Sequence, residues 1–199
     1  MLGSEFTFDQ KDTVLIVVDV QNDFCHEDGA LAKLGKDVRM AQETVPKIEQ
    51  LINLAKDKVK ILYTVMANDY FTTSGAWKTR EIFKKPICLT GSWGTKFYKI
   101  NESLADHIIT KNRHSAFFGT NLDLILRSLG CKKLLVCGFA TNVCVETTIR
   151  DAVAYGYLPV LIKDCTAAFS QSEYNSALFN ISTYFGKVCD MSKVMFAEA

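Results

Sequence analysis

Three reactive side chains each follow a largely apolar run of the chain. They are Asp19, Lys111 and Cys144. If those runs are parallel strands, their carboxyl ends meet at one edge of a sheet, where open α/β folds bind ligands. A carboxylate, an ammonium group and a thiol brought together there could activate the thiol as a nucleophile. We therefore take these residues as the candidate catalytic set.

Each member of this set has a simpler explanation when taken alone. An aspartate after a strand often caps a turn, a lysine there is usually solvated, and a cysteine near a helix start is often a small buried hydrophobe. A fourth polar residue, Asp164, is expected to end the strand over residues 158–162. The joint occurrence of acid, cation and thiol favours a chemical role for the set.

The expected surroundings of Cys144 favour a reactive thiol. Thr141 or Asn142 is a natural N-cap residue, which would place Cys144 in the first turn of a helix. The positive helix end and the ammonium of Lys111 would then lower the pKa of the thiol. Asp19 is expected to accept the thiol proton.

Other kinds of site find little support. The chain has no Gly-x-Ser-x-Gly, Gly-x-Gly-x-x-Gly or P-loop motif. Its three histidines, His26, His107 and His114, lack metal-ligand spacing, so we expect no metal and no organic cofactor. A Cys–His pair remains an alternative, with His114 as the best partner.

Composition indicates an ordinary cytoplasmic globular protein. The 199 residues carry a net charge of +1, which offers no field for nucleic acid or an anionic membrane. Seven cysteines without C-x-x-C spacing indicate reduced thiols. No apolar stretch reaches the roughly 18–20 residues of a membrane span. Residues 1–6 are interpreted as a cloning scar or a disordered N-terminus, and residues 7–199 as one domain.

Apolar runs rich in β-branched residues alternate with helical patterns, which predicts an α/β fold with a parallel sheet covered on both faces. Residues 67–100 show little periodicity and mix aromatics, glycines and charges, which is typical of a lid, a binding loop or an interface. The predicted strands cover residues 13–18, 59–66, 105–110, 133–137, 158–162 and a short segment from 188, and the predicted helices cover 38–56, 121–129, 143–155 and 172–183.

Three motifs resemble those of the isochorismatase-like cysteine hydrolases. They are Val-Val-Asp-Val-Gln-Asn-Asp-Phe at 17–24, the lysine motif at 111–120, and Gly-Phe-Ala-Thr-Asn-Val-Cys-Val-Glu-Thr-Thr at 138–148. The resemblance implies a Rossmann-like three-layer sandwich with a six-stranded parallel sheet.

The same resemblance implies functional roles and an assembly. It implies Asp19, Lys111 and Cys144 as a catalytic triad and a cis peptide between Phe139 and Ala140. The backbone N–H groups of Ala140 and Cys144 would form the oxyanion hole. A homodimer or homotetramer is expected.

The resemblance also bears on the substrate. Nicotinamidases of this superfamily carry an Asp-x-His…His metal site after the second strand, and residues 65–71 here contain no histidine. Residues 177–186 resemble the C-terminal region of ureidoacrylate amidohydrolases and biuret hydrolases. Asn68 and Trp77 also fit that subgroup, and with Trp93 they are the expected substrate contacts.

The prediction is therefore a cysteine-dependent amidohydrolase. It would cleave the C–N bond of a small amide or ureido compound through a thioester. Three alternatives stay open: a nicotinamidase, a general aliphatic amidase, and a non-catalytic binding or redox-sensing protein.

Overall fold

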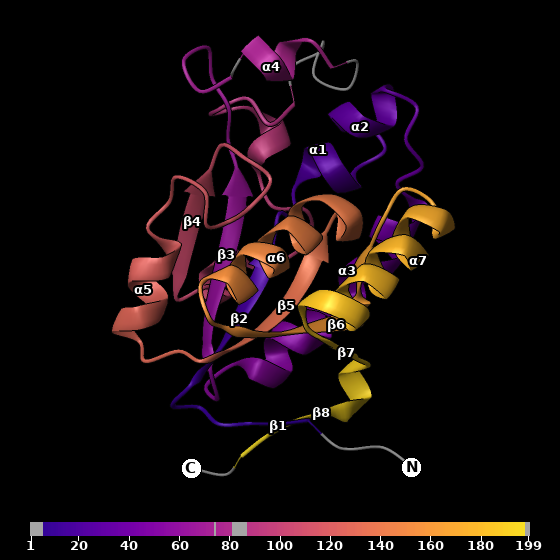
Figure 1. Ribbon diagram of the computed structural model, residues 1–199. Coiled ribbons are helices and arrows are strands. Elements are labelled where there is room, and N and C mark those ends of the chain that lie inside the picture. Colours follow the sequence, from indigo (N-terminus) through magenta and orange to yellow (C-terminus); the bar gives the residue numbers. More distant parts are fainter. Residues whose placement is uncertain (1–5, 74, 81–86, 198–199) are drawn as a thin grey trace.

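A six-stranded, wholly parallel sheet forms the centre of the computed structural model, which describes residues 6–73, 75–80 and 87–197 (Figure 1). The strand order is β4-β3-β2-β5-β6-β7. The order reverses between β2 and β5, and ligands bind at such a switch point in open α/β sheets. The strands are β2 (Thr13–Val18), β3 (Lys60–Met66), β4 (His107–Lys111), β5 (Lys133–Phe139), β6 (Leu158–Ala167) and β7 (Lys187–Cys189).

Helices cover the two faces of this sheet. In Figure 1, α6 crosses one face and α3 lies behind the other, so the domain is a three-layer α/β sandwich as predicted. None of the helices in the described segments is long and apolar enough to cross a membrane. The longer helices are α3 (Arg39–Ala55), α5 (Leu122–Ser128), α6 (Glu146–Ala154) and α7 (Gln171–Asn180).

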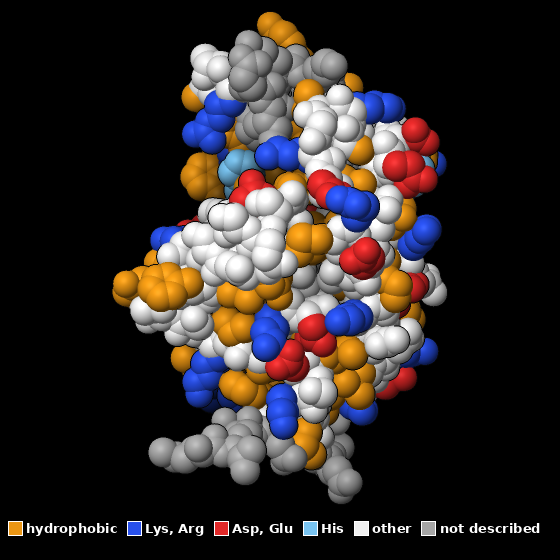
Figure 2. Space-filling model, turned by 90° about the vertical axis from the view of Figure 1, so that its right-hand side faces the viewer, with side chains coloured by type: hydrophobic (Ala, Val, Ile, Leu, Met, Phe, Trp, Pro, Cys, Tyr) orange, Lys and Arg blue, Asp and Glu red, His pale blue; other side chains and the backbone are white. Residues whose placement is uncertain are grey.

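Three short helices lie above the carboxyl ends of the strands in Figure 1. They are α1 (Asn22–Cys25), α2 (Ala30–Lys33) and α4 (Gly75–Lys78). On the face drawn in Figure 2, acidic and basic side chains are interspersed, in keeping with the net charge of +1.

Burial on both faces explains why the central strands could be predicted from the sequence. All six residues of β2 are buried, as expected for a strand covered by helices on both sides. Helix α3 buries one stripe against the sheet at helical spacing, which the sequence pattern predicted. That stripe consists of Ala41, Val45, Ile48, Leu51, Ile52 and Ala55.

Strand β6 is longer than predicted, and this changes the place of Asp164. The strand continues to Ala167 instead of ending at Ile162, because its second half also pairs with β5. Asp164 therefore lies within the strand, and its Oδ1 accepts a hydrogen bond from the Met191 N–H at 2.8 Å. The prediction that Asp164 joins the other polar residues at the sheet edge is wrong.

A second, two-stranded parallel sheet was not predicted. It pairs β1 (Phe6–Phe8) with β8 (Val194–Phe196). Phe6, which we had set aside with the N-terminal residues, begins β1 opposite Val194. Phe8 is buried in the core, so this sheet attaches both ends of the chain to the domain.

Gly138 lets the two central strands approach closely. Its φ is +110°, and a Cβ atom there would lie 2.0 Å from the carbonyl oxygen of Val18, its partner in β2. Any other residue would force β2 and β5 apart. The absent side chain therefore brings the residues that follow the two strands next to each other.

Candidate active site

A fully buried ion pair lies at the carboxyl end of β2. Lys111 Nζ lies 2.7 Å from Asp19 Oδ2, and both side chains have no exposed surface. Lys111 also donates hydrogen bonds to the carbonyl oxygens of Arg113 and His114, each at 3.0 Å. Asp19 Oδ1 accepts one from the Thr64 hydroxyl at 2.6 Å. These hydrogen bonds fix the positions of both charged groups.

The charge on Lys111 persists despite its burial. Burial lowers the pKa of the ammonium group, but the carboxylate of Asp19 and the neighbouring Cys144 outweigh this, so the pKa lies above its usual value. A cation is therefore fixed inside the protein beside the carboxylate.

The backbone turns sharply at Asp19. Its φ is +49°, a left-handed conformation that aspartate and asparagine adopt more readily than most residues. Its N–H contacts the carbonyl and the hydroxyl oxygens of Thr64 at 3.3 and 3.2 Å. Thr64 therefore orients both the backbone and the carboxylate of Asp19. Sequence analysis missed this residue, although a polar side chain inside the apolar run of β3 is a usable signal.

Cys144 completes the group from the other half of the sheet. It lies in a π-helical turn, Thr141–Val145, between β5 and α6, and only 4% of its surface is exposed. Asp19 and Lys111 both lie close enough to shift the pKa of its thiol. The structure therefore brings the three predicted residues together.

The thiol is protonated at neutral pH, contrary to the prediction. Burial raises the pKa of Cys144 to about 12; the cation of Lys111 opposes this, and the carboxylate of Asp19 adds to it. The expected helix cap is also wrong: Ala140 occupies the N-cap position, without a side-chain hydrogen bond. The Thr141 hydroxyl pairs instead with Thr166 Oγ1 at 2.8 Å.

A neutral thiol beside a buried carboxylate suits general-base catalysis. The thiolate would be costly in this desolvated position, so the proton must leave as the sulfur attacks. Asp19 is the carboxylate in contact with Cys144, and it can accept that proton. Lys111 then keeps one positive charge close to the developing negative charge.

A small cavity of about 60 Å³ borders the thiol. Ala140 and Cys144 both line it, and the peptide bond between Phe139 and Ala140 is cis. The oxyanion hole predicted at these two backbone positions stays a prediction. The lining residues are Phe24, Leu31, Met66, Ile87, His114, Ala140, Val143, Cys144 and Phe169.

His114 forms part of the cavity wall. Its Nδ1 lies 3.9 Å from Cys144 Sγ, and its ring stacks on Trp77 with centroids 4.9 Å apart. Burial, followed by the charge of Lys111, lowers the pKa of the imidazole to about 4. His114 is therefore neutral at physiological pH and does not form an imidazolium–thiolate pair with Cys144.

The three expected substrate contacts lie in different environments. Trp77 is buried against His114 and is not among the residues that line the cavity. Asn68 is buried with its Nδ2 donating to the Ile87 carbonyl at 3.4 Å, and its Oδ1 has no hydrogen-bond partner among the described residues. Trp93 is 46% exposed, packs on His26 and does not line the cavity. Their roles stay predictions.

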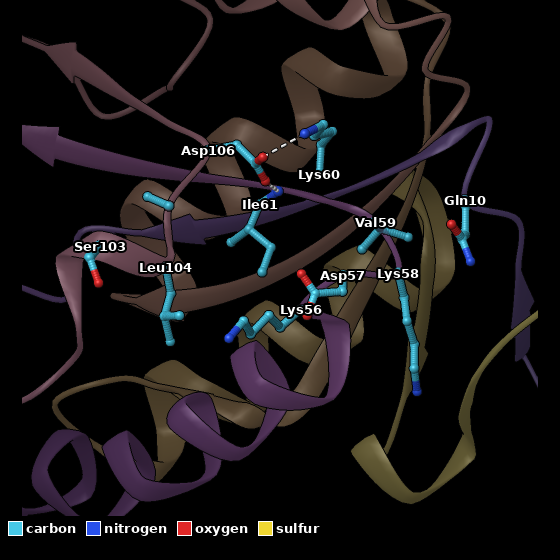
Figure 3. Close-up of a pocket in the computed structure, with 11 residues that line it drawn as sticks. Gln10, Lys56, Asp57, Lys58, Val59, Lys60, Ile61, Ser103, Leu104 and Asp106 are labelled. Atoms are coloured by element: carbon cyan, nitrogen blue, oxygen red, sulfur yellow. Dashed lines mark hydrogen bonds and ion pairs between the residues drawn. The ribbon is translucent and has the colours of Figure 1, made fainter.

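A larger open pocket of about 370 Å³ lies at the opposite end of the sheet, where β3 begins (Figure 3). It contains the ion pair between Lys60 Nζ and Asp106 Oδ1 at 2.6 Å. No cysteine or histidine lines it. Volume therefore does not identify the site, because the reactive residues lie at the smaller cavity.

The described residues do not form a zinc site. Across 6–73, 75–80 and 87–197 there is no group of three histidine, cysteine, aspartate or glutamate side chains able to hold a metal ion. Asn68 stands just after β3, and residues 65–71 contain no histidine. The donor set in this part of the chain therefore does not suit a resident zinc ion.

Solved structures of other proteins share the fold of this chain. A cysteine hydrolase from Pseudomonas syringae pv. phaseolicola is similar with 27% identity and a TM-score of 0.83, covering 97% of this chain and 96% of the other. A pyrazinamidase from Pyrococcus horikoshii, solved in complex with zinc, shares 28% identity with a TM-score of 0.78, covering 90% and 99%.

A pyrazinamidase/nicotinamidase from Streptococcus mutans shares 25% identity with a TM-score of 0.76, covering 89% of this chain and all of the other. The family model of the isochorismatase domain matches residues 13–193, nearly the whole chain. The protein thus belongs to the isochorismatase family of hydrolases.

Proposed function

We propose that this protein is a cysteine-dependent amidohydrolase that cleaves a small amide or ureido compound through a thioester. The observation that carries the proposal is the buried Asp19–Lys111 ion pair beside the Cys144 thiol, where both charges shift the pKa of the thiol. The thiol also borders a small cavity in which a substrate group can lie. A structural role alone gives no reason to bury a carboxylate, an ammonium group and a thiol together.

In the first half of the reaction, Sγ of Cys144 attacks the carbonyl carbon of the substrate. Its proton passes to the carboxylate of Asp19 as the sulfur–carbon bond forms. The backbone N–H groups of Ala140 and Cys144 are proposed to stabilise the oxyanion. Asp19 then gives the proton to the departing nitrogen, the carbon–nitrogen bond breaks, and ammonia or an amine leaves.

In the second half, water attacks the thioester. Asp19 removes a proton from the water, and the carbon–sulfur bond breaks. The sulfur regains its proton from Asp19, which restores the neutral thiol. Lys111 stays protonated throughout and holds the carboxylate in place, with its ammonium group anchored on two carbonyl oxygens.

Nicotinamide hydrolysis is the second candidate. The names of the relatives from Pyrococcus horikoshii and Streptococcus mutans favour it. The lack of a metal-binding cluster in the described segments distinguishes this chain from the zinc complex. The ureidoacrylate and biuret type of substrate rests on the sequence resemblance alone.

The test is ammonia release from a panel of aliphatic amides, ureido acids, biuret and nicotinamide. The Cys144→Ala variant is assayed in parallel, together with Cys144→Ser, which keeps the size and polarity of the side chain. Turnover that both variants abolish supports the proposal. Equal turnover by Cys144→Ala would reject the nucleophile, and nicotinamide as the best substrate would select the second candidate.

A further inference from the structure

The carboxylate of Asp23 is buried and accepts two hydrogen bonds from the backbone of separate segments. Its Oδ1 accepts from the Ala30 N–H at 3.0 Å, and its Oδ2 accepts from the Cys88 N–H at 2.7 Å. Ala30 begins α2, whereas Cys88 lies 65 residues beyond Asp23 in the chain. Only 9% of the Asp23 surface is exposed. One side chain of α1 therefore fastens this helix to two other segments.

The residues that meet at this carboxylate are each adjacent in sequence to a residue that lines the cavity beside Cys144. The adjacent lining residues are Phe24, Leu31 and Ile87. Because neighbouring Cα atoms lie only about 3.8 Å apart across a trans peptide, a restraint on one residue limits the position of the next. Asp23 thus acts on three of the nine residues that line the cavity.

The backbone of Cys88 depends on such restraints. Its φ is +52°, a left-handed conformation that is unfavourable for a residue of this type. Conformations of this kind persist where the surrounding contacts impose them. The Cys88 carbonyl oxygen accepts a hydrogen bond from the Asn68 N–H at 2.8 Å, and its own N–H is held by Asp23. Loss of the carboxylate should let Cys88 relax and Ile87 move with it.

Gly94 leaves the space that the carboxylate occupies. A Cβ atom at this position would lie 2.2 Å from Oδ2 and 2.3 Å from Cγ of Asp23. The neighbouring Trp93 carbonyl oxygen accepts a hydrogen bond from Asn22 Nδ2 at 2.9 Å, which holds this stretch of backbone against α1. The carboxylate therefore lies in a close-fitting slot, with its two hydrogen bonds setting its orientation.

We propose that Asp23 is a positioning residue of the active site, whose carboxylate holds α2 and the backbone at 87–88 at the spacing that sets the width of the cavity beside Cys144. Asp23 is not among the residues that line the cavity, so it acts through Leu31 and Ile87. The consequence for substrate selection rests on the proposed amidohydrolase function, whereas the effect on the width of the cavity does not.

The test compares the alkylation of Cys144 by two reagents of different size. Iodoacetanilide carries a phenyl ring on the amide nitrogen of iodoacetamide. Both reagents meet the same thiol at one fixed pH, so the ratio of their rates, measured by mass spectrometry of the Cys144 peptide, reports the space around the sulfur and not its pKa. Asp23→Asn keeps the shape but replaces one acceptor oxygen by an NH2 group. We expect the ratio of iodoacetanilide to iodoacetamide rates to rise at least about 10-fold.

Gly94→Ala tests the same contact without removing the charge. The added methyl group would displace the Asp23 carboxylate, so the ratio should rise in the same direction. Two matched controls accompany these variants. Asp28→Asn removes a carboxylate whose side chain is 76% exposed, and Gly75→Ala adds a methyl group that meets no atom of the described residues within 4 Å. We expect both controls to stay within about twofold of the unmodified protein.

Cys137 provides an internal control in every sample. It is fully buried in β5, so a substitution that merely loosens the whole protein would expose it together with Cys144. A higher ratio at Cys144 in both variants, without increased labelling of Cys137, supports the proposal. An unchanged ratio in either folded variant, or a parallel rise at both cysteines, overturns it. Because alkylation needs no turnover, either result stands whether or not the Cys144→Ala assay rejects the proposed function.

Discussion

The substitution Lys111→Met should destabilise the protein far more than its small change in shape suggests. At 2.7 Å, the attraction between Lys111 and Asp19 amounts to about 6 kcal/mol with an effective dielectric constant of about 20. Desolvation offsets much of this in the native protein. Removal of one partner, however, leaves the other charge buried and unpaired, which costs about 3–5 kcal/mol.

The double variant Asp19→Asn/Lys111→Met provides the decisive comparison. Asparagine tolerates the left-handed backbone of Asp19, so the substitution removes charge without adding strain. The methionine leaves the carbonyl oxygens of Arg113 and His114 without their donor, at about 1 kcal/mol each. We therefore expect the double variant to lose only about 2 kcal/mol, much less than the sum of the single variants.

Urea denaturation at pH 7, followed by circular dichroism, measures these free energies of unfolding. Ammonia release from the best substrate is followed on the same samples, and all three variants should be inactive. If the double variant is as unstable as the sum of the two single variants, the ion pair is not the source of the cost and our account of the buried charges fails.

Three further predictions concern the thiol, the cavity wall and the strand contact. Iodoacetamide alkylation of Cys144, followed by mass spectrometry, should accelerate about tenfold per pH unit from pH 7 to 10, because a thiol of pKa about 12 gains thiolate over this whole range; a plateau below pH 9 would show a thiolate already formed. The profile of kcat/KM against pH should lack an ionisation near 6.5 and should fall only towards pH 4, where His114 gains a proton beside Lys111; a fall between pH 6 and 7 that disappears in His114→Gln would contradict this. Gly138→Ala should cost more than about 3 kcal/mol, because its Cβ would meet the backbone of β2, whereas Gly156→Ala, with φ +89° and open space, should cost only about 1 kcal/mol; similar thermal shifts for the two variants would refute the close contact.

Much of the sheet could be predicted because its strands are buried on both faces. The run Thr13–Val18 is apolar or β-branched throughout, and the structure places β2 over the same residues. The second half of β6 was missed because Lys163 and Asp164 interrupt the apolar pattern, although both lie within the strand. The pairing of β1 with β8 joins opposite ends of the chain, and local periodicity carries no information on such contacts.

The sequence predicts which residues form the site but not their protonation states. Strand topology suffices to bring Asp19 and Lys111 to one edge, because the parallel strands all point the same way. The protonation of Cys144 depends on burial by many distant residues, which motif spacing does not reveal. The stacking of His114 on Trp77 was missed for the same reason, since the two rings meet only in the folded chain.

The reversal of strand order between β2 and β5 divides the proposed triad between two halves of the chain. Asp19 follows β2 and Lys111 ends β4 on one side of the division, and Cys144 follows β5 on the other. Neither half contains both the nucleophile and its base. The proposed hydrolysis therefore depends on the pairing of β2 with β5, which joins two segments far apart in sequence. If these two strands separated, turnover would stop even while the strands within each half stayed paired. Catalytic activity would then report whether the two halves of the sheet are joined.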